Sequence, residues 1–127
     1  MSTYLLDTTF LIRFLRDDRA AVTWLRKRAT EGDGLACSAI NVAEISAGMR
    51  RHEAGATNAF LSALRCLPVT FEIAREAGQW RESFRARGHE LSLPDALIGT
   101  TALLHDMALV TDNKKDFPLP GLRFAAS

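Results

Sequence analysis

The sequence has few cysteines and no long hydrophobic run, and both features exclude classes of protein. Its two cysteines, Cys37 and Cys66, are too few for a disulfide framework, and no Cys/His spacing typical of structural zinc occurs. We therefore expect both to be reduced core thiols. No apolar run approaches the ~20 residues of a membrane-spanning helix, and no signal peptide is recognisable. These absences favour a cytoplasmic protein without a membrane segment.

An excess of charge of one sign is also lacking. The chain has 16 basic and 15 acidic residues and a net charge of +1. This balance neither indicates nor excludes a nucleic-acid partner, because a local basic patch can exist in a neutral total. With 127 residues, 47% of them hydrophobic, the chain can form one substantial core. We expect a single domain over residues 1–127.

Short apolar segments alternate with amphipathic segments along the chain. The apolar segments predict strands at 3–7, 35–37, 68–69 and 107–110, with a last edge strand at 122–124. The amphipathic segments predict helices at about 9–16, 18–28, 39–51, 57–66, 71–87 and 93–104. This alternation is typical of an α/β fold with a central, mostly parallel sheet flanked by helices.

Four acidic residues occupy positions that such a fold would bring together. Asp7 and Asp112 each follow a predicted strand, and Asp95 lies in the first turn of an almost wholly apolar helix. Glu44 interrupts the apolar face of helix 39–51. Strand ends and helix starts converge at one edge of a parallel sheet, where ligands bind. We expect Asp7, Asp95 and Asp112 at that edge, with Glu44 reaching in from its helix.

Each of these acids also has a purely structural interpretation. Asp7 could be a helix cap and Asp95 a capping-box acid, since Ser92 stands three residues before it. Glu44 could lie on a polar face with Asn41. A functional site is favoured because three of the acids, Asp7, Asp95 and Asp112, recur at strand ends and helix starts. Clustered carboxylates repel one another and require a cation, and oxygen ligands suit Mg²⁺ or Mn²⁺. The implied chemistry is phosphodiester hydrolysis with one or two metal ions.

The polar face of helix 71–87 and the histidines carry no functional signal in the sequence. Arg81 and Arg85 alternate with acids on this face, which we interpret as a solvated surface with local ion pairs. His89 is interpreted as an ordinary residue at the end of the helix.

Four segments, in this order and at this chain length, resemble the PIN-domain ribonucleases of the VapC toxin family. They are Leu6–Thr9, Ser38–Ile45, Leu93–Ile98 and Leu109–Phe117. The resemblance covers essentially the whole chain. It implies a three-layer PIN-like α/β domain, in which a central, mostly parallel sheet is flanked by helices.

The resemblance also implies roles for individual residues. Asp7 and Asp95 match catalytic metal ligands, Glu44 matches the acid that completes the cluster directly or through water, and Thr9 matches a position that supports the site's geometry. The fourth acid has three alternatives in one loop, namely Asp112, Asn113 and Asp116. We favour Asp116 as the catalytic, metal-binding acid. The remaining residues of this loop are assigned supporting roles: Thr111, Asp112 and Asn113.

Partners follow from the same resemblance. It implies a homodimer, an RNA substrate (tRNA and rRNA both suit the site) and a small VapB-like antitoxin that blocks the active site. Four cations flank the predicted acidic edge and are candidates for RNA binding, although each also suits a plain solubilising role: Arg13, Arg16, Lys114 and Lys115.

Two other functions compete with the nuclease. A PIN-like module with a degenerate site would serve only in protein binding; the retention of Asp7, Glu44 and Asp95 argues against it, and the displaced fourth acid keeps it open. A receiver-type phosphoacceptor domain has a similar length and fold class. Receivers carry paired early acids, whereas Asp7 is followed by Thr8 and Thr9.

Overall fold

A computed structural model describes residues 2–125. The strands are β1 (Thr3–Leu6), β2 (Gly34–Ser38), β3 (Arg65–Leu67) and β4 (Ala108–Val110). The α-helices are α1 (Thr8–Leu15), α2 (Arg19–Thr30), α3 (Ala39–Gly48), α4 (Ala54–Ala63), α5 (Phe71–Ala86) and α6 (Leu93–Leu104). Two short 3₁₀ helices are η1 (Arg51–Glu53) and η2 (Lys114–Asp116). In the described residues, no helix is long and apolar enough to cross a membrane.

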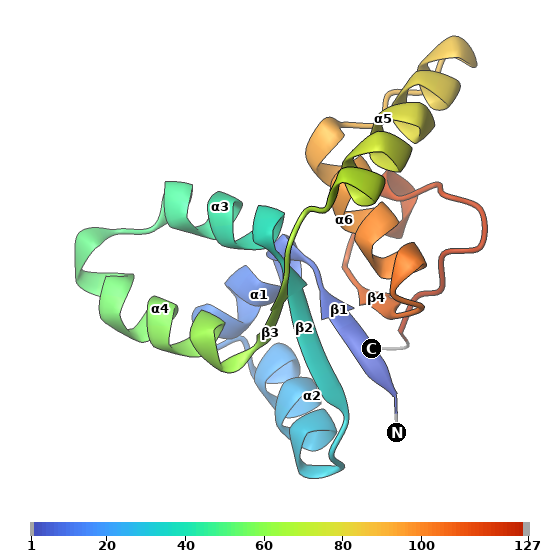
Figure 1. Ribbon diagram of the computed structural model, residues 1–127. Coiled ribbons are helices and arrows are strands. Elements are labelled where there is room, and N and C mark those ends of the chain that lie inside the picture. The colour runs from blue at the N-terminus through green and yellow to red at the C-terminus, as the bar shows by residue number, and fades with distance from the viewer. Residues whose placement is uncertain (1, 126–127) are drawn as a thin grey trace.

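The four strands form one parallel sheet in the order β3-β2-β1-β4 (Figure 1). The chain moves outward from β1 to β2 and β3, and then crosses back to place β4 on the other side of β1. The strand order therefore reverses between β1 and β4. In open α/β sheets, ligands bind beyond the carboxyl ends of the strands at such a reversal.

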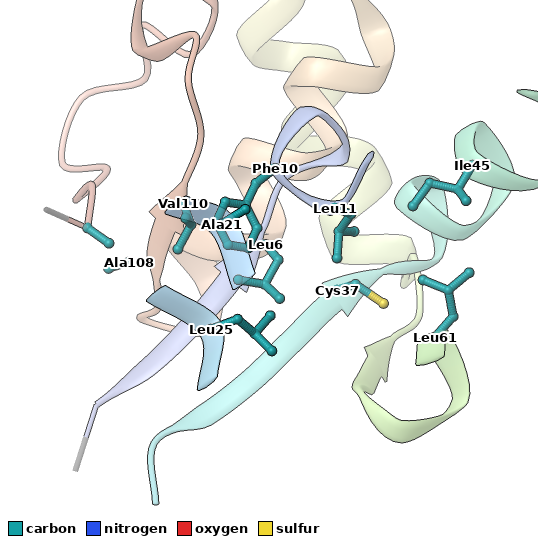
Figure 2. Packing of buried hydrophobic residues seen from close by; sticks show 11 residues of the cluster. Leu6, Phe10, Leu11, Ala21, Leu25, Cys37, Ile45, Leu61, Ala108 and Val110 are labelled. Atoms are coloured by element: carbon teal, nitrogen blue, oxygen red, sulfur yellow. The ribbon is translucent and has the colours of Figure 1, made fainter. Parts of the chain in front are cut away.

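Helices cover both faces of the sheet, because successive residues of a buried strand point to opposite sides. On one face, Leu6 and Val110 pack against helices α1 to α4 (Figure 2); the helix residues of this core include Phe10, Leu11, Ala21, Leu25, Ile45 and Leu61. On the other face, Leu5 and Leu109 pack against α6, through Ile98 and Ala102, and against the C-terminal segment. These layers confirm the predicted three-layer α/β architecture.

Several predicted boundaries differ from the structure. The third strand lies at Arg65–Leu67 and not at 68–69, because Pro68 has no N–H for a ladder hydrogen bond. The helix predicted at 39–51 ends at Gly48, and the helix predicted at 57–66 is Ala54–Ala63. The last edge strand is reduced to a single bridge between Leu109 and Phe124.

The two cysteines lie opposite each other on neighbouring strands. Cys37 on β2 is in register with Cys66 on β3. Cys37 is buried, whereas Cys66 is exposed, so the prediction of two core thiols is wrong for Cys66. β3 is the edge strand of the sheet, and the side chain of an edge residue is less well covered than that of its inner partner.

Close packing against α6 positions the C-terminal loop. A Cβ atom at Gly99 would lie 2.7 Å from Leu119 Cδ1 and 3.5 Å from Phe117 Cδ1, so glycine allows this approach. Phe117 and Leu119 are buried in the core on the α6 side of the sheet. The η2 segment immediately before them, which ends at Asp116, is thereby held beside α6.

Candidate active site

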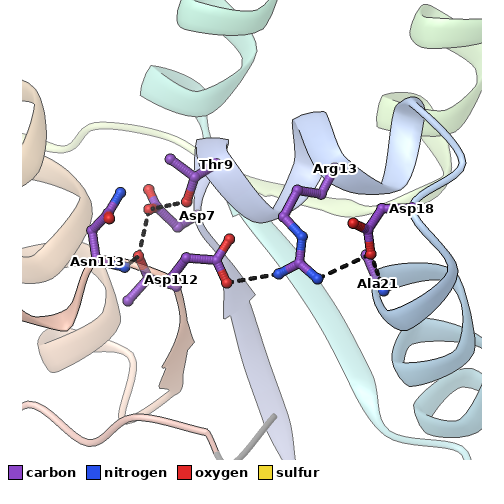
Figure 3. Close-up of polar contacts among 8 residues, drawn as sticks. Asp7, Thr9, Arg13, Asp18, Ala21, Asp112 and Asn113 are labelled. Atoms are coloured by element: carbon purple, nitrogen blue, oxygen red, sulfur yellow. Dashed lines mark hydrogen bonds and ion pairs between the residues drawn. The ribbon is translucent and has the colours of Figure 1, made fainter.

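Asp7 lies at the carboxyl end of β1, at the reversal of strand order. Its N–H donates to Val110 O at 3.0 Å, which continues the β1–β4 pairing. Its side chain is 5% exposed and does not cap α1. Instead, Oδ2 accepts hydrogen bonds from Thr111 Oγ1 at 2.7 Å and Thr9 Oγ1 at 3.1 Å (Figure 3). Asp7 is the N-cap residue of α1 by position, but its carboxylate makes no capping hydrogen bond, so capping does not account for this side chain.

The hydroxyl of Thr111 has a fixed orientation. It accepts a hydrogen bond from the N–H of Asn113 at 3.1 Å while it donates to Asp7. Both side-chain donors to Asp7 end on Oδ2, and within residues 2–125 no hydrogen bond reaches Oδ1. The carboxylate is thus held by one oxygen, and the other remains available to a ligand.

A second chain of hydrogen bonds holds Glu44. Thr8 Oγ1 donates to Glu44 Oε1 at 2.7 Å, and Asn41 Nδ2 donates to Thr8 Oγ1 at 2.9 Å. Asn41 Oδ1 accepts from the N–H of Ser38 at 2.8 Å, in a capping box at the start of α3. The headgroup of Glu44 is exposed, but its position relative to β1 is fixed through Thr8.

Thr8 and Asn41 are residues that the sequence reasoning missed. Asn41 is fully buried and does not share a polar face with Glu44. The signal that could have identified it is the Ser-x-x-Asn spacing of Ser38 and Asn41, since a capping box directs the side chain of its last residue back to the cap.

Asp95 lies in the first turn of α6, where its N–H donates to Ser92 Oγ at 3.2 Å. Burial raises the pKa of the Asp95 carboxyl, and the hydrogen bond with Ser92 opposes this effect. The negative charges of Asp7, Asp116 and Glu44 raise the pKa further. These acids come from distant parts of the chain, and each adds to the upward shift in the pKa of Asp95. Glu44 is hydrogen-bonded to Thr8, the residue after Asp7, so these two acids adjoin the carboxyl end of β1. We refer to Asp7, Glu44, Asp95 and Asp116 as the acidic cluster.

Among the alternatives for the fourth acid, Asp112 is already paired with an arginine. Its Oδ1 accepts from Arg13 Nη1 at 2.7 Å, and Arg13 Nη2 donates to Asp18 Oδ1 at 3.0 Å (Figure 3). The hydrogen bond from Arg13, together with the Ala21 N–H, lowers the pKa of Asp18. Asp116, in contrast, is exposed, and its negative charge raises the pKa of Asp95.

The remaining predicted cations have different surroundings. Arg13 is held between two carboxylates, which leaves it less available to a phosphate. Arg16 lines a cavity of about 310 Å³ between α1, α3 and α4, together with Glu44. Lys114 Nζ lies 5.9 Å from the centre of the Phe124 ring, and Lys115 is exposed.

The acidic cluster has the donor chemistry of a hard divalent cation, because all its ligand atoms are carboxylate or hydroxyl oxygens. As the side chains stand, no three His, Cys, Asp or Glu residues in the described chain are arranged to hold one ion. Asp7 is fixed by two hydroxyls and Glu44 by the Thr8 hydroxyl, whereas Asp116 is exposed. The cluster therefore fits a metal ion in charge and ligand type.

Comparisons with known proteins agree with this geometry. The family model of the PIN domain matches residues 4–119. The chain is 35% identical over 115 residues to ribonuclease VapC19 of Mycobacterium tuberculosis, covering 91% of this chain and 92% of that protein. A toxin–antitoxin complex from Klebsiella pneumoniae contains a chain of 32% identity, with 94% of each chain covered and a TM-score of 0.74.

The fold has a further match in VapBC2 from Rickettsia felis, solved with a DNA fragment from its promoter. Its TM-score is 0.85 at 23% identity, with 97% of each chain covered, so it supports the fold alone. The family match spans nearly all of the described chain, and the relative VapC19 exceeds one third identity over the same length. The protein therefore belongs to the PIN-domain family and, within it, to the VapC ribonucleases.

Proposed function

We propose that the protein is a metal-dependent endoribonuclease and the toxin of a toxin–antitoxin pair. The observation that carries this proposal is the buried Asp7, whose carboxylate is held through one oxygen by two hydroxyls. The charges of Asp7, Asp116 and Glu44 also raise the pKa of Asp95. Such an arrangement is costly unless a cation neutralises it. Membership among the VapC ribonucleases supports RNA as the substrate.

In this proposal, Asp7, Asp95, Glu44 and Asp116 hold Mg²⁺ or Mn²⁺. The bound ion supplies an activated water and neutralises charge on the phosphate in the transition state. Thr9 and Thr111 keep Asp7 in one orientation, which leaves Oδ1 free to bind the ion. The Thr8 hydroxyl orients Glu44 in the same way. Outer hydrogen bonds of this kind maintain the geometry and basicity of metal ligands.

The nuclease proposal is tested by cleavage of labelled RNA with Mg²⁺, with Mn²⁺ and with excess chelator. Cleavage should require the metal, and Asp7→Asn should abolish it, because the substitution removes a charge from the cluster and keeps the shape. Asp17→Asn is the matched control, since Asp17 is exposed and its left-handed backbone, with φ of 59°, suits asparagine. Undiminished cleavage in excess chelator would reject the metal mechanism.

We further propose that a small VapB-like antitoxin inhibits the site from the cavity between α1, α3 and α4. Ile12, Leu15 and Met49 offer an apolar lining, and the two acids Glu44 and Glu53 outnumber the one cation, Arg16. This lining suits an apolar tail that carries a basic residue. Expression of the protein alone should arrest growth, and co-expression of the antitoxin should relieve the arrest. Harmless expression of a well-folded chain would count against a toxin.

The proposal includes a homodimer and a cytoplasmic location. The molar mass in solution, measured by light scattering, tests the dimer. The degenerate PIN-like module remains the second candidate only if the folded protein fails to cleave RNA in both metals. Family membership does not favour the receiver-type alternative.

A further inference from the structure

A second hollow lies where the chain leaves α5 and enters α6. Figure 1 shows the two helices that this connection joins. Its volume is about 770 Å³. The residues that line this α5–α6 cleft include Arg81, Arg85, His89, Glu90, Ser92 and Pro94. Ser92 caps the turn that contains Asp95, so the cleft opens within one helical turn of the acidic cluster.

The arginines of the α5–α6 cleft are not paired with acids. Arg81 and Arg85 are four residues apart and therefore share one face of α5. Neither forms an ion pair in residues 2–125, contrary to the local pairing expected from the sequence. Arg87 behaves differently: its guanidinium lies over the Phe84 ring at 4.4 Å, and its Nε donates to Ser83 O at 3.4 Å. Arg75, also on α5, is unpaired as well within the described chain but does not line the cleft, so Arg81 and Arg85 are the arginines of this helix that are both unpaired and directed to the hollow.

The loop that closes the cleft has a defined conformation. The φ of Gly88 is 80°, in the left-handed region that glycine adopts more readily than other residues. The N–H of Gly88 donates to Arg85 O at 3.0 Å, and the N–H of His89 donates to Phe84 O at 2.8 Å. These two bonds form a Schellman motif, which ends α5 and reverses the chain. His89 also packs edge-on against Phe84, with ring centres 6.2 Å apart. The cleft is therefore preformed.

We propose that the α5–α6 cleft binds backbone phosphates of the RNA strand next to the cleaved bond, through Arg81 and Arg85. This inference rests on the proposed nuclease function and adds substrate-positioning residues to it. Like charges four residues apart on a helix repel each other, and a phosphate between them removes that repulsion. The planar guanidinium matches the geometry of phosphate oxygens.

The acidic cluster favours a subsite of this kind. Four carboxylates repel the phosphates of RNA beyond the one that the metal neutralises, so strand affinity must come from cations outside the cluster, among which Arg16 and Lys115 are also exposed. Arg13 is already paired with Asp18 and Asp112. Glu90 is the one acidic residue that lines the cleft, against Arg81 and Arg85. The net charge of the lining is therefore positive.

Binding is measured in an Asp7→Asn background, with a fluorescently labelled single-stranded oligouridylate as the probe. The cleft variant is Arg81→Gln/Arg85→Gln, and the control is Arg26→Gln/Arg75→Gln, which removes the same charge from exposed positions outside the cleft. The cleft variant should raise Kd about tenfold and reduce the slope of log K against log salt by about 1.4, or 0.7 per phosphate contact. The control should leave both close to the parent values.

Kinetics of the enzyme with Asp7 intact separate strand binding from support of the catalytic centre. The cleft variant should raise KM for the oligouridylate with little change in kcat. It should hydrolyse bis-p-nitrophenyl phosphate like the wild type, because this small diester has no neighbouring phosphate to occupy the cleft. An equal loss on both substrates would show that the arginines maintain the fold of the site, and would overturn the subsite.

Failure of the subsite and failure of the nuclease proposal give different results. If the wild type cleaves RNA and the cleft variant matches the control in Kd, slope and KM, the subsite is overturned and the nuclease stands. If the wild type fails to cleave in either metal and the cleft variant still loses RNA affinity, the nuclease proposal fails while RNA binding by the cleft stands.

Discussion

Thr111→Val tests whether one hydroxyl orients the buried carboxylate of Asp7. Valine has nearly the shape of threonine, so the substitution removes the hydrogen-bonding group without opening a cavity. The Thr111 hydroxyl donates to Asp7 Oδ2 at 2.7 Å and accepts from the Asn113 N–H at 3.1 Å. Asp7 would keep one side-chain donor, Thr9, at 3.1 Å. The carboxylate should then lose its single orientation.

Two magnitudes follow from this geometry. A hydrogen bond to a charged, buried group contributes about 1.5–3 kcal/mol, so the free energy of unfolding should fall by an amount in this range. Loss of an outer hydrogen bond to a metal ligand weakens metal affinity or activity by about 10–100-fold. The variant should therefore need a higher Mn²⁺ concentration for half-maximal cleavage, by a factor in that range.

The assays are urea unfolding of the metal-free protein and cleavage of labelled RNA over a series of Mn²⁺ concentrations. Thr100→Val is the matched control, because Thr100 on α6 is fully buried and, in the described chain, its Oγ1 has no hydrogen-bond partner. Removing an unpaired buried hydroxyl should leave the free energy of unfolding unchanged or raise it by about 1 kcal/mol. The Mn²⁺ dependence of this control should equal that of the wild type.

The reasoning about Thr111 is refuted if Thr111→Val unfolds at the wild-type urea concentration and retains the wild-type Mn²⁺ dependence. Equal losses in both valine variants would also refute it, because the effect would then come from replacing any buried threonine. A stability loss without a change in Mn²⁺ dependence would limit Thr111 to a structural role.

Three further predictions concern other parts of the structure. Asn41→Leu should lower the free energy of unfolding in urea by about 1–3 kcal/mol, because the buried N–H of Ser38 loses its acceptor. It should also lower the rate of RNA cleavage, because Thr8 loses the hydrogen bond that holds it against Glu44. Cleavage at the wild-type rate would contradict this positioning role of Asn41. Asp95→Asn should be more stable than the metal-free wild type at neutral pH, because burial and neighbouring acids raise the pKa of Asp95 and its ionised form destabilises the fold. Thermal unfolding at a series of pH values measures this difference in stability. The difference should disappear as the pH falls through the raised pKa to below 3.8, where Asp95 is protonated in both the folded and the unfolded state. A thiol reagent should modify Cys66 quickly and Cys37 only on unfolding, because burial raises the pKa of Cys37 to about 12; a fast phase that survives Cys66→Ser would contradict this.

Much of the local structure follows from the order of the residues. The Ser92 cap predicts where α6 begins, and the apolar segment before Asp7 predicts that this acid ends a strand. These features depend on neighbours within a few positions, which a sequence displays directly. The same local rules missed β3 by about three residues, because a short edge strand is chosen by its pairing with β2 and not by its own composition.

The sequence by itself determined the α/β class, the family, the places of Asp7 and Asp95 at element boundaries and the place of Glu44 within a helix. Only the tertiary structure decided how other side chains are used. Arg13 meets Asp112 across 99 positions of the chain, and Asn41 reaches Thr8 across 33. Contacts of this kind depend on how separate elements pack, and spacing within one element carries no information about them.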